Sequence, residues 1–92
     1  MCYNPYWEAI VMTVYELGNK LNQMYNTPNE GKVAMIHLFG IMYAREIINA
    51  QLTAVDVIRS SGLNESYKTE IQKGMNLANY VEVKEQYRKK FQ

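Results

Sequence analysis

The segment from Arg59 to Asn76 carries the side chains whose types and spacing best fit contact with DNA. Amides can bond adenine at two atoms, hydroxyls reach base edges or phosphates, and cations neutralise phosphates. If Ile71 and Met75 face inward, a helical step of 100° per residue turns the polar residues outward. The candidate DNA-binding residues are Arg59, Ser66, Lys68, Thr69, Gln72, Lys73 and Asn76. Any solvated helix has a similar surface, so the pattern alone does not decide between a helix that reads DNA and an ordinary solvated helix.

Side chains for catalysis or metal binding are scarce. His37 is the only histidine and Cys2 the only cysteine, so we expect no metal-ligand cluster and no internal disulfide. At the centre of an apolar segment, a histidine is more often a hydrogen-bonded core residue than a general base. The sequence also has no glycine-rich phosphate loop and no paired catalytic carboxylates. We therefore expect neither an enzyme nor a protein with a cofactor or metal.

The net charge of +1 gives no global attraction to nucleic acid, so DNA binding would depend on the distribution of charge. The last residues are the most basic part of the chain, with Lys84, Arg88, Lys89 and Lys90 against Glu85. Cations at a helix C-terminus are favoured by the helix dipole, which makes a solvated helix end the preferred interpretation. A patch that contacts phosphates is the alternative.

The length of 92 residues and the 48% hydrophobic content predict one globular domain over residues 1–92. No apolar run approaches the roughly 18 residues that a membrane span needs. The first ten residues lack the basic region and cleavage site of a signal peptide. We therefore expect a cytoplasmic protein with no membrane partner.

Helical periodicity divides the first half of the chain into two elements. Asn4 and Pro5 are suited to open a helix that ends near Asn26, with one apolar stripe of Trp7, Ile10, Val11, Val14, Leu17, Leu21, Met24 and Tyr25. Pro28 then stops this helix, and Asn29 is available to cap the next one, over about residues 30–51.

The helix at about 30–51 is apolar on several faces, which is typical of a central helix. Such a helix can be covered by several neighbours in a monomer, or by a second subunit. The two explanations have similar weight in so short a chain. Because this helix has more apolar surface than a 92-residue monomer can easily cover, a homodimer is expected. Met42 and Phe39 are candidates for the outward, dimer-forming positions.

Capping residues place two further helices. Thr53 and Asp56 form a near relative of the capping box, Gly62 fits a left-handed helix end, and Asn64 can cap the following helix. On that helix the predicted inner stripe is Tyr67, Ile71, Met75 and Ala78. Gly74 lies near the stripe, where it either lets another helix approach or bends the chain.

The last element is predicted as a fifth helix, because Tyr80, Val83, Tyr87 and Phe91 recur at helical spacing. A short strand over 80–84 is the alternative, although no hairpin partner is visible. The whole chain therefore predicts an all-α, compact bundle of four to five helices.

Residues 53–76 resemble a helix-turn-helix unit. Gly62, Leu63 and Ile71 stand where that motif places its turn glycine and two packing positions. Three positions depart from it: Ile58 replaces a small residue, Ser61 an apolar one and Lys68 an aliphatic one. These departures affect the crossing angle of the two helices and hence how they would dock in the major groove of DNA.

Two longer stretches, "HLFGIMYAREI" and "GLNESYKTEIQKGMNLANYV", are similar to small helix-turn-helix-like proteins from bacterial mobile and defence loci. The resemblance implies binding of double-stranded DNA by a small transcriptional regulator or accessory DNA-binding factor. The alternative is a dimeric helical protein-interaction or structural module without DNA binding, since such corners serve many functions.

Overall fold

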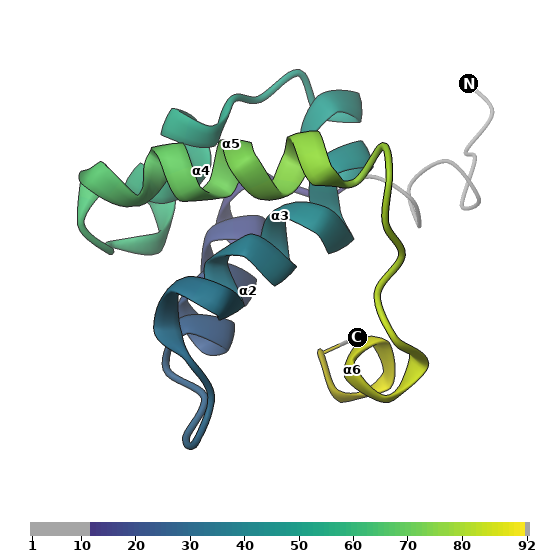
Figure 1. Cartoon of the computed structure of the whole chain (residues 1–92). Helices are drawn as coiled ribbons and strands as arrows, with labels where there is room; N and C mark the ends of the chain where they lie inside the picture. Colours follow the sequence, from purple (N-terminus) through teal and green to yellow (C-terminus); the bar gives the residue numbers. More distant parts are fainter. Residues whose placement is uncertain (1–11, 92) are drawn as a thin grey trace, which may run out of the picture.

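The computed structural model describes residues 12–91, which form five α-helices and one 3-10 helix without any strand (Figure 1). This confirms the predicted all-α fold. The elements are α2 (Val14–Tyr25), α3 (Lys32–Asn49), α4 (Ala54–Ser61), η1 (Glu65–Tyr67), α5 (Lys68–Leu77) and α6 (Glu85–Phe91).

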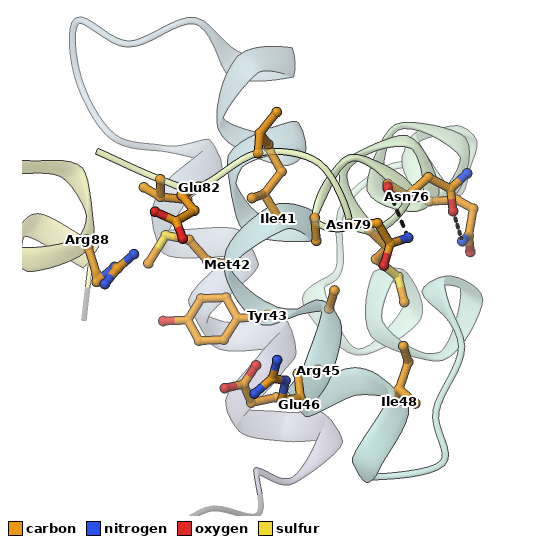
Figure 2. Close-up of a pocket in the computed structure, with 16 residues that line it drawn as sticks. Ile41, Met42, Tyr43, Arg45, Glu46, Ile48, Asn76, Asn79, Glu82 and Arg88 are labelled. Atoms are coloured by element: carbon orange, nitrogen blue, oxygen red, sulfur yellow. Dashed lines mark hydrogen bonds between the residues drawn. The ribbon is translucent and has the colours of Figure 1, made fainter. Parts of the chain in front are cut away.

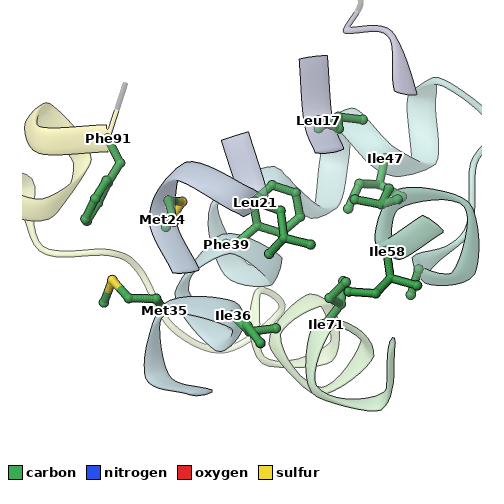
Figure 3. Packing of buried hydrophobic residues seen from close by; sticks show 12 residues of the cluster. Leu17, Leu21, Met24, Met35, Ile36, Phe39, Ile47, Ile58, Ile71 and Phe91 are labelled. Carbon is green, nitrogen blue, oxygen red and sulfur yellow. The ribbon is translucent and has the colours of Figure 1, made fainter. Parts of the chain in front are cut away.

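The helices are arranged as two crossing pairs. α4 packs mainly on α2, and α5 packs mainly on α3, while α2 and α3 join the two pairs. The contact between α4 and α5 is smaller. A single apolar cluster fills the space between the pairs (Figure 3), and its fully buried members are Leu17, Leu21, Met24, Ile36, Phe39, Ile47, Val57, Ile58 and Ile71.

α2 begins later than the sequence pattern predicts. Thr13 is its N-cap: the hydroxyl of Thr13 accepts from the amide of Glu16 at 3.1 Å, and the carboxylate of Glu16 accepts from the amide of Thr13 at 3.0 Å. This reciprocal capping box gives Thr13 an extended backbone, so the prediction of one helix running through Thr13 to Asn26 is wrong. The proposed opening at Asn4 and Pro5 lies outside the described residues.

α3 is the central helix of the described part, with α2 and α5 on two of its faces. Its N-cap is Gly31 without a side-chain bond, and Asn29 instead adopts a left-handed backbone (φ 66°), so the prediction that Asn29 caps the helix is wrong. Phe39 is fully buried in the core, which rules it out as an outward position. Met42 is only partly buried.

Within residues 12–91, no single helix is both long and apolar enough to cross a membrane. α3 and α4 meet that criterion only when taken together, across a bend of 112° between them.

The turn between α4 and α5 forms as its residues predict. Thr53 and Asp56 make a reciprocal capping box at the start of α4, and Gly62 ends that helix in the left-handed conformation (φ 78°). Asn64 accepts a hydrogen bond from the amide of Ser66 at 2.9 Å, which starts η1 rather than α5 itself. The 3-10 turn then leads directly into α5.

Glycines allow both helix pairs to cross closely. A Cβ atom built on Gly40 of α3 would lie 2.9 Å from the Cα of Gly74 of α5, and one built on Gly18 of α2 would lie 2.8 Å from the carbonyl carbon of Ser60. Real Cβ atoms essentially never come so close. Gly74 therefore permits a close helix approach, which was one of the two roles predicted for it.

The C-terminal segment crosses from the end of α5 to a short helix beside α3. The predicted fifth helix is present as α6, but it starts at Glu85, so Tyr80 and Val83 lie outside it; residues 81–84 have no regular structure, and the alternative of a strand over 80–84 is wrong. Phe91 anchors α6: its ring is buried, and its carbonyl accepts a hydrogen bond from the hydroxyl of Tyr43 at 3.2 Å. Lys90 also lies 3.7 Å from the carboxylate of Glu30.

Candidate nucleic-acid interface

α5 is held by one side and leaves the other side open. Ile71 and Gly74 are buried against α3, and Met75 is partly buried beside them. Every candidate DNA-binding residue is exposed: Arg59, Ser66, Lys68, Thr69, Gln72, Lys73 and Asn76. The structure therefore brings six of them to one side of η1 and α5, and places Arg59 on α4, next to the turn.

The polar groups of this surface bond to one another. The Nε2 of Gln72 donates to the Oδ1 of Asn76 at 3.0 Å, one helical turn away, and the hydroxyl of Thr69 donates to the carbonyl of Ser66 at 3.2 Å. These exposed bonds contribute little net free energy in water. The amides of Gln72 and Asn76 can therefore exchange their mutual bond for bonds to a base edge without a large cost in free energy.

Carboxylates accompany two of the three cations. Arg59 lies 3.1 Å from Glu65, and Lys73 lies 3.1 Å from Glu70. Exposed ion pairs contribute about 0 to 1 kcal/mol, so a phosphate can compete for either cation. Lys68 forms no ion pair with any residue of the described chain. It is the cation of this surface with no local competitor.

A histidine and a carboxylate connect α3 to α5. The Nε2 of His37 bonds the Oε2 of Glu70, so His37 is hydrogen-bonded as expected. Its side chain is one-third exposed, however, and His37 is therefore not the core residue that the sequence indicated. The hydrogen bonds from His37 and from Lys73 lower the pKa of the Glu70 carboxyl below its ordinary value. No group of three or more potential metal ligands occurs among residues 12–91.

Two of the departures from the helix-turn-helix pattern have structural explanations. Ile58 is fully buried in the shared core. The hydroxyl of Ser61 is buried too; it donates to the carbonyl of Ile58 at 2.6 Å and accepts from the amide of Leu63 at 3.1 Å. The carbonyl of Ser61 accepts in turn from the side chain of Asn22 at 3.0 Å. Ser61 thus satisfies backbone groups of the turn, a task that an apolar residue could not perform.

The third departure, Lys68, lies at the first position of α5 and is exposed. Its neighbour Tyr67 makes the inward contact instead. The rings of Tyr67 and Tyr25 pack 5.5 Å apart, and their hydroxyls lie 3.3 Å from each other. This hydrogen bond, together with the nearby Tyr25 charge, raises the pKa of Tyr67. The start of α5 is thereby fixed on α2 while Lys68 remains free to point into solvent.

A groove extends from the C-terminal end of α5 to α6, over the outer side of α3 (Figure 2). Its open volume is about 810 Å³. Gln72 and Asn76 lie at its edge, and the segment 81–83 forms another wall. Four charged residues that the sequence interpretation did not single out also line it: Arg45, Glu46, Glu82 and Arg88. Only the interruption of the apolar run at Arg45 and Glu46 could have signalled this surface.

The crossing pairs, the glycine turn and the exposed side of α5 together define a small all-helical domain with a helix-turn-helix-like corner. The chain belongs to the HTH-like domain family, whose model matches residues 13–84. The match extends far beyond the unit at 53–76 and includes α2 and α3. No curated protein and no solved structure matches the chain.

Proposed function

We propose that this protein binds double-stranded DNA through η1 and α5, as a small transcriptional regulator or accessory DNA-binding factor. The observation that carries this proposal is the orientation of α5, with Ile71 and Gly74 fixed on α3 and the polar side open. A helix held in this way can enter the major groove, which is wide enough for an α-helix.

The start of the exposed side is suited to the first contacts, because recognition helices touch bases mainly with their N-terminal residues. Ser66 and Thr69 supply hydroxyls there, and Lys68 supplies a charge for phosphate. Gln72 lies one turn further on, where its amide is in reach of an adenine. Lys73 and Arg59 add phosphate contacts once they leave Glu70 and Glu65.

The affinity should fall with salt only to the extent that individual cations contact phosphates. The unit at 53–76 carries three cations, Arg59, Lys68 and Lys73, and three carboxylates, Asp56, Glu65 and Glu70. Its own charge thus supplies no excess attraction, and contacts to phosphates must come from individual side chains.

Fluorescence anisotropy on a library of labelled duplexes at several salt concentrations tests the proposal. Lys68→Ala should weaken binding to all duplexes and lower the slope of log affinity against log salt by about one unit. Gln72→Ala should instead cost roughly 1 to 3 kcal/mol on the preferred duplex and reduce its preference. Lys20→Ala, which removes the same charge from α2, is the matched control and should leave binding unchanged.

Absence of binding to every duplex at about 20 mM salt would overturn the proposal, because electrostatic attraction is least screened there. Equal effects of Lys68→Ala and Lys20→Ala would also contradict it, since they would indicate nonspecific attraction by the whole molecule.

The second candidate is a helical protein-interaction module. One observation favours it: the carboxylates of Glu65 and Glu70 lie on the same helical corner as the cations and pair with two of them. A protein partner tolerates this balanced charge better than a phosphate backbone does. Under this alternative the DNA-binding assays give no signal, and the sensitive positions lie in the groove over α3.

A further inference from the structure

We propose that the surface around the groove over the outer side of α3 packs against the same surface of a second copy of this chain, giving a two-fold symmetric dimer. The groove is defined by Ile41, Met42, Arg45, Glu46 and Ile48 of α3, the C-terminal end of α5, the segment 81–83 and Arg88 of α6. This inference rests on features other than those that carry the proposed DNA binding, and either can fail without the other.

Apolar and polar side chains share the lining of the groove, and some of the apolar ones are incompletely covered. Ile41, Met42 and Met75 are partly buried in it. Ile48 is 64% exposed and Val81 44% exposed, although both are large apolar side chains. Covering them would contribute about 25 cal/mol for each Å² of apolar surface removed from water. The α3 helix therefore has a third apolar face, which α6 covers only in part.

The charges of the groove indicate which partner would cover it. Arg45 and Arg88 supply two cations, and Glu46 and Glu82 supply two carboxylates. None of the four makes an ion pair with a residue of the described chain, so all four can pair with a partner.

Equal numbers of unpaired opposite charges are what a two-fold interface requires. In such an interface the same patch meets itself, so each cation of one copy can face a carboxylate of the other. Nucleic acid would instead be repelled by Glu46 and Glu82, and a strongly charged protein would leave two of the four groups unmatched.

Glu46 adds a further reason. Its Oε2 is screened from solvent and has no hydrogen-bond donor within residues 12–91. A buried acceptor without a partner is unfavourable, and more so when it is charged. Glu46 also lines the groove, so a rotation of its carboxylate would bring this oxygen within reach of a cation of the second copy.

The dimer leaves the N-terminal part of the proposed DNA contacts free, whereas Gln72 and Asn76 belong to both surfaces. The groove reaches α5 at Gln72, Met75 and Asn76, from the middle of the helix toward its C-terminal end, and Asn79 lines it just beyond the helix. Ser66, Lys68 and Thr69, at the opposite end, do not line it and stay accessible. A two-fold dimer would thus present two copies of the N-terminal end of α5, the arrangement by which paired units read two half-sites.

Sedimentation equilibrium of the full chain in the absence of DNA, from about 5 to 500 μM, tests the dimer. Ile48→Asp should raise the dimer dissociation constant at least tenfold, because it places a charge in the lining of the groove. Tyr15→Asp is the matched control: Tyr15 is 74% exposed, apolar in most of its surface and located on α2. A wild-type chain that stays monomeric at 500 μM, or equal effects of the two variants, would overturn the proposal.

A charge-reversal pair tests the two-fold arrangement itself. The acidic variant Arg45→Glu with Arg88→Glu has four carboxylates in the groove, and the basic variant Glu46→Lys with Glu82→Lys has four cations. Each alone should be monomeric because like charges would meet, while a 1:1 mixture should form a heterodimer. Circular dichroism establishes that both variants are folded. If the folded variants remain dimers alone, or do not associate when mixed, the groove is not the self-association surface. If the basic variant loses its helical signal, Glu82→Lys alone takes its place in the same mixture.

Discussion

Gly40 of α3 and Gly74 of α5 face each other where the two helices cross. A Cβ built on Gly74 would lie 3.0 Å from the Cα of Gly40, and closer still to the carbonyl oxygen of His37. The obstacles on both sides are backbone atoms, which cannot turn away as a flexible side chain can. The two glycines therefore set the distance between the helix that carries the candidate DNA contacts and the helix that forms the groove.

Gly74→Ala should destabilise the domain by about 1 to 3 kcal/mol, the usual cost of overpacking a core. The added methyl pushes α5 away from α3 and opens the packing around Ile71. Urea unfolding followed by circular dichroism measures the change. Gln72→Ala, at an exposed position of the same helix, is the control and should alter the free energy of unfolding by less than about 0.5 kcal/mol. Equal stability of both variants would show that the crossing can widen freely.

Gly62→Ala should cost about 1 to 2 kcal/mol, because the backbone there is left-handed. No atom lies within 4 Å of a Cβ at this position, so a clash cannot contribute. Gly62→Asn should cost less, since asparagine tolerates this conformation better than alanine does. Thermal unfolding of the two variants separates conformational strain from steric effects, and a larger loss for asparagine would contradict the explanation.

Glu70→Gln should reduce the sensitivity of the fold to acid. The folded chain lowers the pKa of Glu70 below its ordinary value near 4.5, through the bonds from His37 and Lys73. The stability that this carboxylate contributes is therefore present above about pH 4.5 and is lost as the pH falls through the lowered value. The free energy of unfolding of Glu70→Gln should be lower than that of the wild type at pH 7, and the two should converge at low pH.

Glu65→Gln provides the control for that experiment. Its carboxylate pairs with Arg59 in an ion pair of which both side chains are at least half exposed, and such pairs contribute little. Its unfolding curve should follow the wild type more closely between pH 3 and pH 7. An acid response equal in both variants would mean that the His37–Glu70 contact has no special role.

Phe91→Ala should release α6 without unfolding the rest. Phe91 lies at one end of the core cluster, on the side of Met24 and Met35 (Figure 3), and its ring is almost fully buried. Hydrogen exchange should then become faster in residues 85–91 while protection in α2 to α5 persists. Tyr80→Ala removes an aromatic ring that is 85% exposed and should leave both regions unchanged. Global loss of protection would show that α6 is an integral part of the core.

The parts of the fold that the sequence predicts correctly depend on neighbouring residues. The capping box of Thr53 and Asp56 involves residues three positions apart, and the left-handed end of α4 needs only a glycine. The same kind of signal is present at Thr13, where the capping box with Glu16 starts α2 although the apolar periodicity of the sequence runs through this position. Local chemistry would have been a better guide there than periodicity.

Other features depend on contacts that no local pattern contains. His37 lies in an apolar run, yet it is partly exposed because α5 brings Glu70 to it. Phe39 and Met42 are equally apolar, and the packing of the other helices against α3 decides that Phe39 is the buried one. The groove requires Arg45, Glu82 and Arg88 to meet from three separate segments. Its existence could not be predicted without the arrangement of the helices.

The alternation of the two helix pairs along the chain has a consequence for how the protein folds. Neither pair is made of consecutive helices: Asn22 and Ser61, which connect α2 to the end of α4, are 39 residues apart, and His37 and Glu70 are 33 residues apart. Consecutive helices meet mainly in the less extensive contacts of α2 with α3 and of α4 with α5, so a hairpin of neighbours forms little of the final packing. Each pair must close a long loop before its contacts form, which slows folding relative to a bundle of sequential neighbours. During synthesis, α3 stays without its main partner until α5 has left the ribosome, so the nascent chain exposes its most apolar helix longest.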